Sequence, residues 1–271
     1  MSLFTVNGSQ LEIQQIKGAD HLAPIVFLHE GLGSVSLWTQ HGLDWPAAVC
    51  RATGRAGVVY SRRGYGRSAP AARTAESGSH PALLAPDYMH SQAWEVLPAL
   101  LGCLEAQHPP FNPRLKTPVL LGHSDGATIA LLYASRFLVA GCIAMAPHVL
   151  VEDIAVQAIT RAKADFERGM RERLARHHTD VDGAFWQWND VWLSKAFNSF
   201  DIRPECASIS APLLLIQGTN DGYGTMRQLD EIALVAPHAR QIRLLDCGHS
   251  PQRDQPVVTL QAVVDFLRTI G

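Results

Sequence analysis

Short runs of apolar residues alternate with longer segments of helical periodicity along most of the chain. Each apolar run is bounded by polar or glycine-rich turns, which is typical of strands that are buried on both faces. These runs predict strands at residues 24–28, 57–60, 119–121, 141–146, 212–216 and 241–245. The segments between them predict helices over about 37–52, 90–107, 127–136 and 257–269. Such alternation predicts an α/β fold with a mostly parallel, doubly wound sheet.

The first and the middle part of the chain depart from this alternation. Residues 3–6 and 11–14 are rich in β-forming residues and flank Asn7-Gly8, so we expect a hairpin that gives the sheet an antiparallel start. Residues 69–87 are rich in alanine, proline, serine and glycine, and they predict a loop with little structure of its own.

A longer interruption lies between two of the predicted strands. Residues 149–208 carry charged helix-forming residues (RAKADFERGMRERLARHH), then an aromatic stretch (FWQWNDVWLSKAFNSF), and no strand pattern. Because strands precede and follow this segment, it predicts a helical cap inserted into one α/β core. The core then consists of residues 1–148 and 209–271.

The overall charge and composition narrow the classes of partner. The chain is 47% hydrophobic and 18% charged, with a net charge of −2, as in an ordinary soluble enzyme. Without a basic excess, neither nucleic acid nor an anionic membrane surface is the expected partner, which leaves a small-molecule substrate. No apolar run approaches the roughly 20 residues that a membrane-spanning helix needs. The sequence does not determine the oligomeric state, and a homo-oligomer is one of the possible states.

The cysteines, the histidines and the N-terminus add expectations about compartment and cofactor. Five cysteines without CxxC spacing predict reduced thiols, and the first residues lack the basic and apolar regions of a signal peptide. We therefore expect a cytoplasmic protein. The histidines lack the spacing of metal-binding motifs, so neither a metal nor another cofactor is expected.

One stretch, PVLLGHSDGATIALLY at residues 118–133, carries the strongest chemical signal. A buried strand leads into Gly-x-Ser-x-Gly, and a helix follows, which is the context that a nucleophile elbow requires. Glycines at 122 and 126 let strand and helix close around Ser124, and the helix N-terminus favours negative charge developing beside it. Ser124 is thus a candidate nucleophile.

Two more candidate catalytic residues follow later strands. Asp221 comes after residues 212–216 and His249 after residues 241–245. Ligands of open α/β sheets bind beyond the carboxyl ends of the strands, so the serine, the acid and the histidine should converge at one edge. Asp246 is an alternative acid because it is near His249 in sequence, and Asp221 itself could be an ordinary turn residue in Asn-Asp-Gly.

This order of serine, acid and histidine resembles the α/β-hydrolase fold superfamily, in its serine-nucleophile, carboxylesterase-like branch. The resemblance covers nearly the whole chain and includes residues 29–34, RGYGRS at 63–68 and CGHSP at 247–251. It implies that Ser124 is the nucleophile, His249 the general base and Asp221 the residue that orients the imidazole. Ser61 departs from the pattern, since members often carry an aspartate there.

The resemblance also implies an oxyanion hole made by backbone N–H groups. One donor is Asp125, and the other is Gly31, with Glu30 or Leu32 as neighbouring registers. The Glu30 carboxylate, where a glycine is common, is either held by structural hydrogen bonds or contacts substrate.

Several further side chains allow two interpretations each. His148 either faces the pocket or lies behind it. Three tryptophans of the cap either form core or line an apolar substrate pocket: Trp186, Trp188 and Trp192. Three arginines are interpreted as structural or surface charges: Arg62, Arg63 and Arg67.

A serine nucleophile argues against the epoxide hydrolase and haloalkane dehalogenase branches, which use aspartate. We expect hydrolysis of a small or medium, largely apolar carboxylic ester through an acyl-enzyme on Ser124. The alternatives on the same triad are a thioesterase, a lactonase, a carbon–carbon bond hydrolase and an acyltransferase. A non-catalytic ligand receptor of this fold is the alternative from another class.

Overall fold

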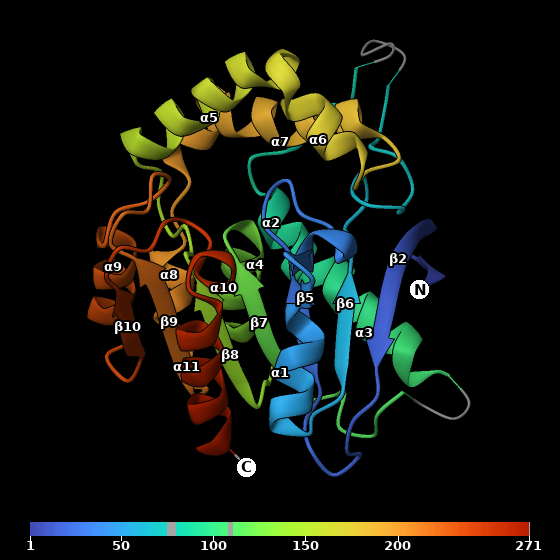
Figure 1. Cartoon of the computed structure of the whole chain (residues 1–271), viewed down its shortest axis with the longest axis vertical. Coiled ribbons are helices and arrows are strands. Elements are labelled where there is room, and N and C mark those ends of the chain that lie inside the picture. The colour runs from blue at the N-terminus through green and yellow to red at the C-terminus, as the bar shows by residue number, and fades with distance from the viewer. Residues whose placement is uncertain (75–79, 108–110, 271) are drawn as a thin grey trace.

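The computed structural model describes residues 1–74, 80–107 and 111–270, and its centre is one eight-stranded sheet (Figure 1). The strand order is β1-β2-β6-β3-β7-β8-β9-β10. The first two contacts are antiparallel and the others parallel, as the sequence predicts. The strands are β1 (Ser2–Val6), β2 (Ser9–Ile16), β3 (Ile25–Leu28), β6 (Gly57–Tyr60), β7 (Val119–His123), β8 (Gly141–Met145), β9 (Leu213–Gly218) and β10 (Arg240–Leu244).

Apolar side chains on both faces of the strands explain why helices cover both sides of the sheet. In β3, Val26 and Leu28 belong to one core cluster, whereas Ile25 and Phe27 belong to a second cluster on the other face. Successive side chains of a strand point to opposite faces, so a wholly apolar run requires a cover on each. The predicted doubly wound α/β fold is confirmed.

The helices that provide these covers come from both ends of the chain. On one face, α1 (Trp45–Thr53) packs beside α11 (Pro256–Arg268), as Figure 1 shows in front of the sheet. The other face is covered by α3 (Leu97–Glu105) and α4 (Asp125–Ala134), whose apolar side chains belong to the first cluster. Further helices flank the sheet: α2 (Tyr88–Ser91), α8 (Arg203–Cys206), α9 (Arg227–Val235) and α10 (Pro251–Asp254).

A third group of helices lies over the carboxyl ends of the strands, at the top of Figure 1. It consists of α5 (Asp153–Asp165), α6 (Arg171–Ala175) and α7 (Val181–Leu193), which we call the helical layer. A single isolated bridge, Leu150 to Asp201, is the only β-pairing of residues 149–208. The segment is therefore helical, as predicted, while the domain boundaries at 149 and 208 stay a prediction.

The prediction of a helix over residues 37–52 is wrong for its first half. A 3₁₀ turn (Val35–Trp38) and a small hairpin of β4 (Thr39–Gln40) and β5 (Leu43–Asp44) replace it, because Gly42 and His41 adopt left-handed φ angles of 78° and 51°. The helix α1 starts only after Asp44, whose side chain accepts a hydrogen bond from the Ala47 N–H at 2.9 Å.

The helix expected over residues 90–107 is present but divided. A π-helical turn (Gln92–Val96) separates α2 from α3. Pro98 follows that turn and has no N–H for the carbonyl four residues earlier, which explains the wider local register. Among the residues that the structure describes, no helix has the length and apolar character needed to cross a bilayer.

Candidate active site

Ser124 occupies a strained turn between β7 and α4. Its φ and ψ are 53° and −121°, outside the regions that L-residues normally adopt. A Cβ on Gly122 would lie 2.1 Å from the Gly126 carbonyl oxygen, and one on Gly126 would lie 2.1 Å from the Leu28 carbonyl oxygen. Only glycine fits at both positions, so the sequence pattern forces strand and helix together and leaves the serine at the apex.

Ser124, His249 and Asp221 form a continuous hydrogen-bonded relay. The Ser124 Oγ lies 3.0 Å from His249 Nε2. On the other side of the ring, His249 Nδ1 lies 2.9 Å from both carboxylate oxygens of Asp221. Nδ1 therefore donates to the carboxylate, and a neutral ring then leaves Nε2 free to accept the serine proton. The structure thus brings together the three strand-end residues that the sequence singles out.

The surroundings of Asp221 keep it ionised. Burial by itself would raise the pKa of this carboxyl, but the hydrogen bond from His249 and the Tyr223 N–H at 2.8 Å lower it below its ordinary value. The Gln217 amide also donates to Asp221, at 3.2 Å. Asp246, the alternative acid, is exposed and has no contact with His249.

The loop that follows β3 is held by a buried arginine. The Arg62 guanidinium donates to the carbonyl oxygens of His29 and Glu30, at 2.5 and 2.9 Å. No described residue accepts a hydrogen bond from the Gly31 N–H, and Asp125 is the first residue of α4, where an N–H has no intrahelical acceptor. Both N–H groups are thus free for a ligand beside Ser124. Arg62 is structural, one of the two interpretations given above.

The departure at Ser61 is compensated from the neighbouring strand. Ser61 Oγ donates to Glu12 Oε2 at 2.8 Å and accepts the Val35 N–H at 2.9 Å. The same Glu12 oxygen accepts the Arg67 N–H at 3.0 Å. A carboxylate therefore still supports the loop at the end of β6, but it comes from β2.

A cavity of about 330 Å³ opens above Ser124. Its wall includes six of the residues proposed from the sequence as oxyanion-hole or pocket residues: Glu30, Gly31, Asp125, His148, Trp188 and Trp192. Trp186 does not line this cavity: it contacts Phe166 and His80 on the far side of α7. Residues two apart on a helix point to different faces, and we propose no substrate contact for Trp186.

Comparisons with known proteins agree with this geometry. Residues 25–262 match the model of the alpha/beta hydrolase family. The chain belongs to that family. No curated protein sequence matches it.

Solved structures of other α/β hydrolases share the fold at low sequence identity. The enol-lactonase of Burkholderia xenovorans LB400 is 22% identical, with a TM-score of 0.70 over 98% of this chain and 100% of the other. A carboxylesterase of the thaumarchaeon Nitrososphaera gargenis is 15% identical, with a TM-score of 0.73 over 99% and 98%. A meta-cleavage product hydrolase of Pseudomonas fluorescens IP01 is 13% identical, with a TM-score of 0.71 over 100% and 98%. At these identities the likeness shows the fold alone.

The α/β hydrolase has a second imidazole–carboxylate pair beside the relay. Glu30 Oε2 lies 3.4 Å from His123 Nδ1, and His123 Nε2 donates to the His249 carbonyl oxygen at 2.7 Å. Burial would raise the pKa of Glu30, but His123 and its other neighbours lower it to about 2. Glu30 is thus structurally bonded, one of its two interpretations, while it still borders the cavity.

A hydrogen-bond chain joins the α/β hydrolase core to the helical layer. The Trp192 indole donates to the Tyr88 hydroxyl at 3.1 Å, and Tyr88 donates to the Asp125 carboxylate at 2.6 Å. Burial raises the pKa of the Tyr88 hydroxyl, so the phenol remains a donor at neutral pH. Sequence reasoning missed Tyr88 because it lies at the end of a loop without any motif.

Five residues that line the cavity were also not proposed from the sequence as pocket residues: His123, Ile159, Tyr223, Ser250 and Arg253. Tyr223 and Arg253 follow Asp221 and His249 by two and four positions, so the strand-end rule that found the relay contained a signal for them.

Among the described residues, no group of three or more His, Cys, Asp or Glu side chains could hold a metal ion. The absence of a cofactor stays a prediction.

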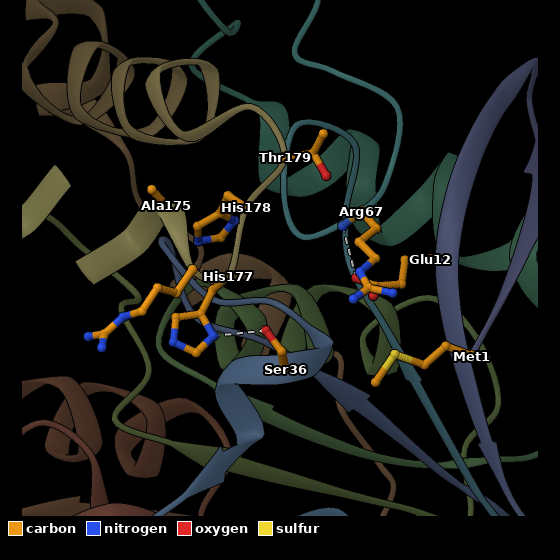
Figure 2. A pocket seen from close by; sticks show the side chains of 9 residues that line it. Met1, Glu12, Ser36, Arg67, Ala175, His177, His178 and Thr179 are labelled. Atoms are coloured by element: carbon orange, nitrogen blue, oxygen red, sulfur yellow. Dashed lines mark hydrogen bonds between the residues drawn. The ribbon is translucent and has the colours of Figure 1, made fainter. Parts of the chain in front are cut away.

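A second cavity, of about 220 Å³, lies away from Ser124 in this α/β hydrolase (Figure 2). Its wall includes Arg67, Ser36 and His177. The dashed line between Ser36 and His177 in Figure 2 marks the 2.9 Å bond from Ser36 Oγ to His177 Nδ1. The adjoining His178 accepts the Gly66 N–H and donates to the Leu32 carbonyl, at 2.9 and 3.0 Å. His178 thus fastens the segment between α6 and α7 to the loop after β3.

Buried neutral histidines should make the hydrolase sensitive to acid. Burial lowers the pKa of His148 to about 3 and of His178 to about 4, and that of His29 well below its ordinary value. These histidines become protonated near pH 6.5 in the unfolded chain but only at lower pH in the folded protein. The free energy of unfolding therefore falls as the pH drops below 6.5. We expect about 1.4 kcal/mol per pH unit for each histidine, thus about 4 kcal/mol between pH 5.5 and 4.5.

Urea unfolding at a series of pH values measures this slope. His148→Gln should flatten the slope by about one third, whereas the exposed His21 offers a matched control, His21→Gln, that should leave it unchanged. A wild-type stability that is constant from pH 6.5 to 4.5 would contradict the prediction.

Proposed function

We propose that this α/β hydrolase is a serine esterase that cleaves a small or medium, largely apolar carboxylic ester. The observation that carries the proposal is the relay itself: Ser124 Oγ, His249 and Asp221 are joined at 3.0 and 2.9 Å below a cavity. A serine within hydrogen-bond reach of an imidazole that a carboxylate orients is the arrangement of an activated nucleophile.

The first half of the proposed reaction forms an acyl-enzyme. His249 Nε2 takes the proton of Ser124 Oγ while the oxygen attacks the ester carbonyl carbon. The resulting oxyanion accepts hydrogen bonds from the N–H groups of Gly31 and Asp125. Its collapse breaks the bond to the alkoxy oxygen, which takes the proton from His249 and leaves as the alcohol.

The second half regenerates the enzyme. A water molecule gives one proton to His249 Nε2 and attacks the acyl carbon, and collapse of this second oxyanion breaks the bond to Ser124 Oγ. The serine recovers its proton from His249, and the carboxylic acid is released. No metal or cofactor is required for either half.

The size and lining of the cavity support the proposed substrate class. A volume of about 330 Å³ lies at the lower end of the range for small-molecule sites. Ile159, Trp188 and Trp192, all from residues 149–208, supply its apolar wall. We therefore propose that this segment acts as the cap over the site.

The five cysteines carry no disulfide, which supports the proposed cytoplasmic location.

The same relay can also hydrolyse lactones, thioesters or a carbon–carbon bond, or transfer the acyl group to another acceptor. Solved structures that share the fold include an enol-lactonase and a meta-cleavage product hydrolase. Acyl-enzyme chemistry on an ester requires the fewest groups beyond those in the cavity, and for this reason we place it first.

Hydrolysis of nitrophenyl esters of increasing acyl length tests the proposal. We expect turnover that peaks at a short or medium acyl chain, because longer chains exceed the cavity. A fluorophosphonate probe should also label the protein at Ser124. Labelling without turnover on any ester would redirect the assignment to the other acyl substrates, and a protein that is neither labelled nor active would be the ligand receptor.

A further inference from the structure

The Trp188 side chain reaches from the helical layer to the loop after β3. A Cβ built on Gly31 would lie 2.2 Å from Trp188 Nε1 and 2.5 Å from its Cδ1. The nitrogen edge of the indole therefore occupies the space where Gly31 lacks a side chain. Both residues line the cavity that contains Ser124.

The indole N–H of Trp188 has no acceptor among the described residues. Its neighbour on α7, Trp192, donates to the Tyr88 hydroxyl at 3.1 Å, and Trp94 donates to the Leu132 carbonyl at 2.9 Å. The Trp188 nitrogen is also not sealed from solvent, unlike those of Trp38 and Trp45. A polar group at the wall of a cavity that no protein atom satisfies is available to a ligand.

The chemistry of the ligand atom follows from the donor. An indole nitrogen can only donate, so its partner must be an acceptor. The Gly31 N–H, also without a partner, belongs to the residue that the indole touches, and the Asp125 N–H lies beside Ser124 on the same cavity. Three donors thus border the cavity in which the proposed ester would present its carbonyl oxygen to Ser124.

We propose that Trp188 is a catalytic residue that donates its indole N–H to the carbonyl oxygen of the substrate, as a third donor beside the N–H groups of Gly31 and Asp125. The inference rests on the proposed function. As Ser124 attacks, the carbonyl oxygen gains negative charge, and a donor that is already held in place stabilises that charge more than it stabilises the neutral ester. One of the three donors then comes from the helical layer.

The decisive variants remove the N–H and keep an aromatic wall. Trp188→Phe deletes the donor, and replacement of Trp188 by benzothienylalanine exchanges only N–H for sulfur at nearly constant shape. Trp186→Phe is the matched control, since Trp186 is on the same helix outside the cavity. The first readout is the rate of Ser124 labelling by a fluorophosphonate, whose phosphoryl oxygen gains charge in the same place and which requires no knowledge of the substrate.

We expect both Trp188 variants to lower the labelling rate and kcat for a nitrophenyl ester by about 10- to 100-fold with little change in KM, while Trp186→Phe keeps the wild-type rates. If the benzothienylalanine variant has wild-type rates and only Trp188→Phe is slow, Trp188 is packing alone and the inference is wrong. A wild-type protein whose Ser124 is not labelled would instead overturn the proposed function, and this inference with it.

Discussion

Replacing Ser124 by alanine should lower kcat/KM for ester hydrolysis by about 10⁴-fold or more. The substitution removes the oxygen that lies 3.0 Å from His249 Nε2, the one hydrogen-bond partner of that nitrogen among the described residues, so no acyl-enzyme can form. Alanine would adopt the same positive φ of 53° that Ser124 adopts. Because the substitution adds no backbone strain, the fold should be retained. Steady-state kinetics on the best nitrophenyl ester, beside a thermal melt, measures both expectations.

The matched control is Ser135→Ala, ten positions beyond the start of α4. Its hydroxyl donates to the Leu132 carbonyl oxygen at 2.8 Å, at the end of the helix, and Ser135 does not line the cavity, so the activity should be unchanged. A Ser124→Ala protein that keeps more than a small fraction of the wild-type turnover would show that the reaction does not pass through this serine.

Asp221→Asn should lower kcat by about 10⁴-fold although the side chain keeps its shape. An amide can present its NH₂ group to His249 Nδ1, which then accepts rather than donates. The ring proton moves to Nε2, the atom that must take the serine proton, and the imidazole stands in the wrong tautomer. The 2.9 Å contacts between Nδ1 and both carboxylate oxygens are the reason for which we propose Asp221 as the orienting group.

Asp246→Asn decides between the two candidate acids. Asp246 is exposed on the loop after β10 and is not hydrogen-bonded to His249, so its substitution should leave kcat nearly unchanged. Kinetics of both variants on one ester gives the comparison. The reverse result, a large loss at 246 and none at 221, would show that the loop is rearranged during turnover.

Much of the fold could be predicted because buried parallel strands appear in the sequence as continuous apolar runs. An apolar run such as residues 119–121 of β7 has no polar position and can only lie between two covered faces. The prediction of a helix over residues 37–44 failed for the opposite reason. Their apolar spacing continues through a turn in which His41 and Gly42 adopt left-handed φ angles, and a histidine at such an angle carries no compositional signal.

The site divides in the same way. The rule that ligands bind beyond strand ends depends on topology, so it places Ser124, Asp221 and His249 together without any side-chain geometry. The partners of Glu30 and the free N–H of Trp188 depend instead on rotamers and on the docking of α7, which no spacing encodes. The roles of these residues in catalysis stay proposals until the variants are measured.

The bonds of His178 determine how far the helical layer can be exchanged between relatives. His178 belongs to residues 149–208, the predicted cap, yet its ring satisfies the Gly66 N–H and the Leu32 carbonyl, two groups outside that segment. A chimera that receives another protein's residues 149–208 without this histidine would leave both core groups unsatisfied beside the loop that carries Gly31. We therefore expect a functional chimera to need the helical layer together with the two loops that His178 binds.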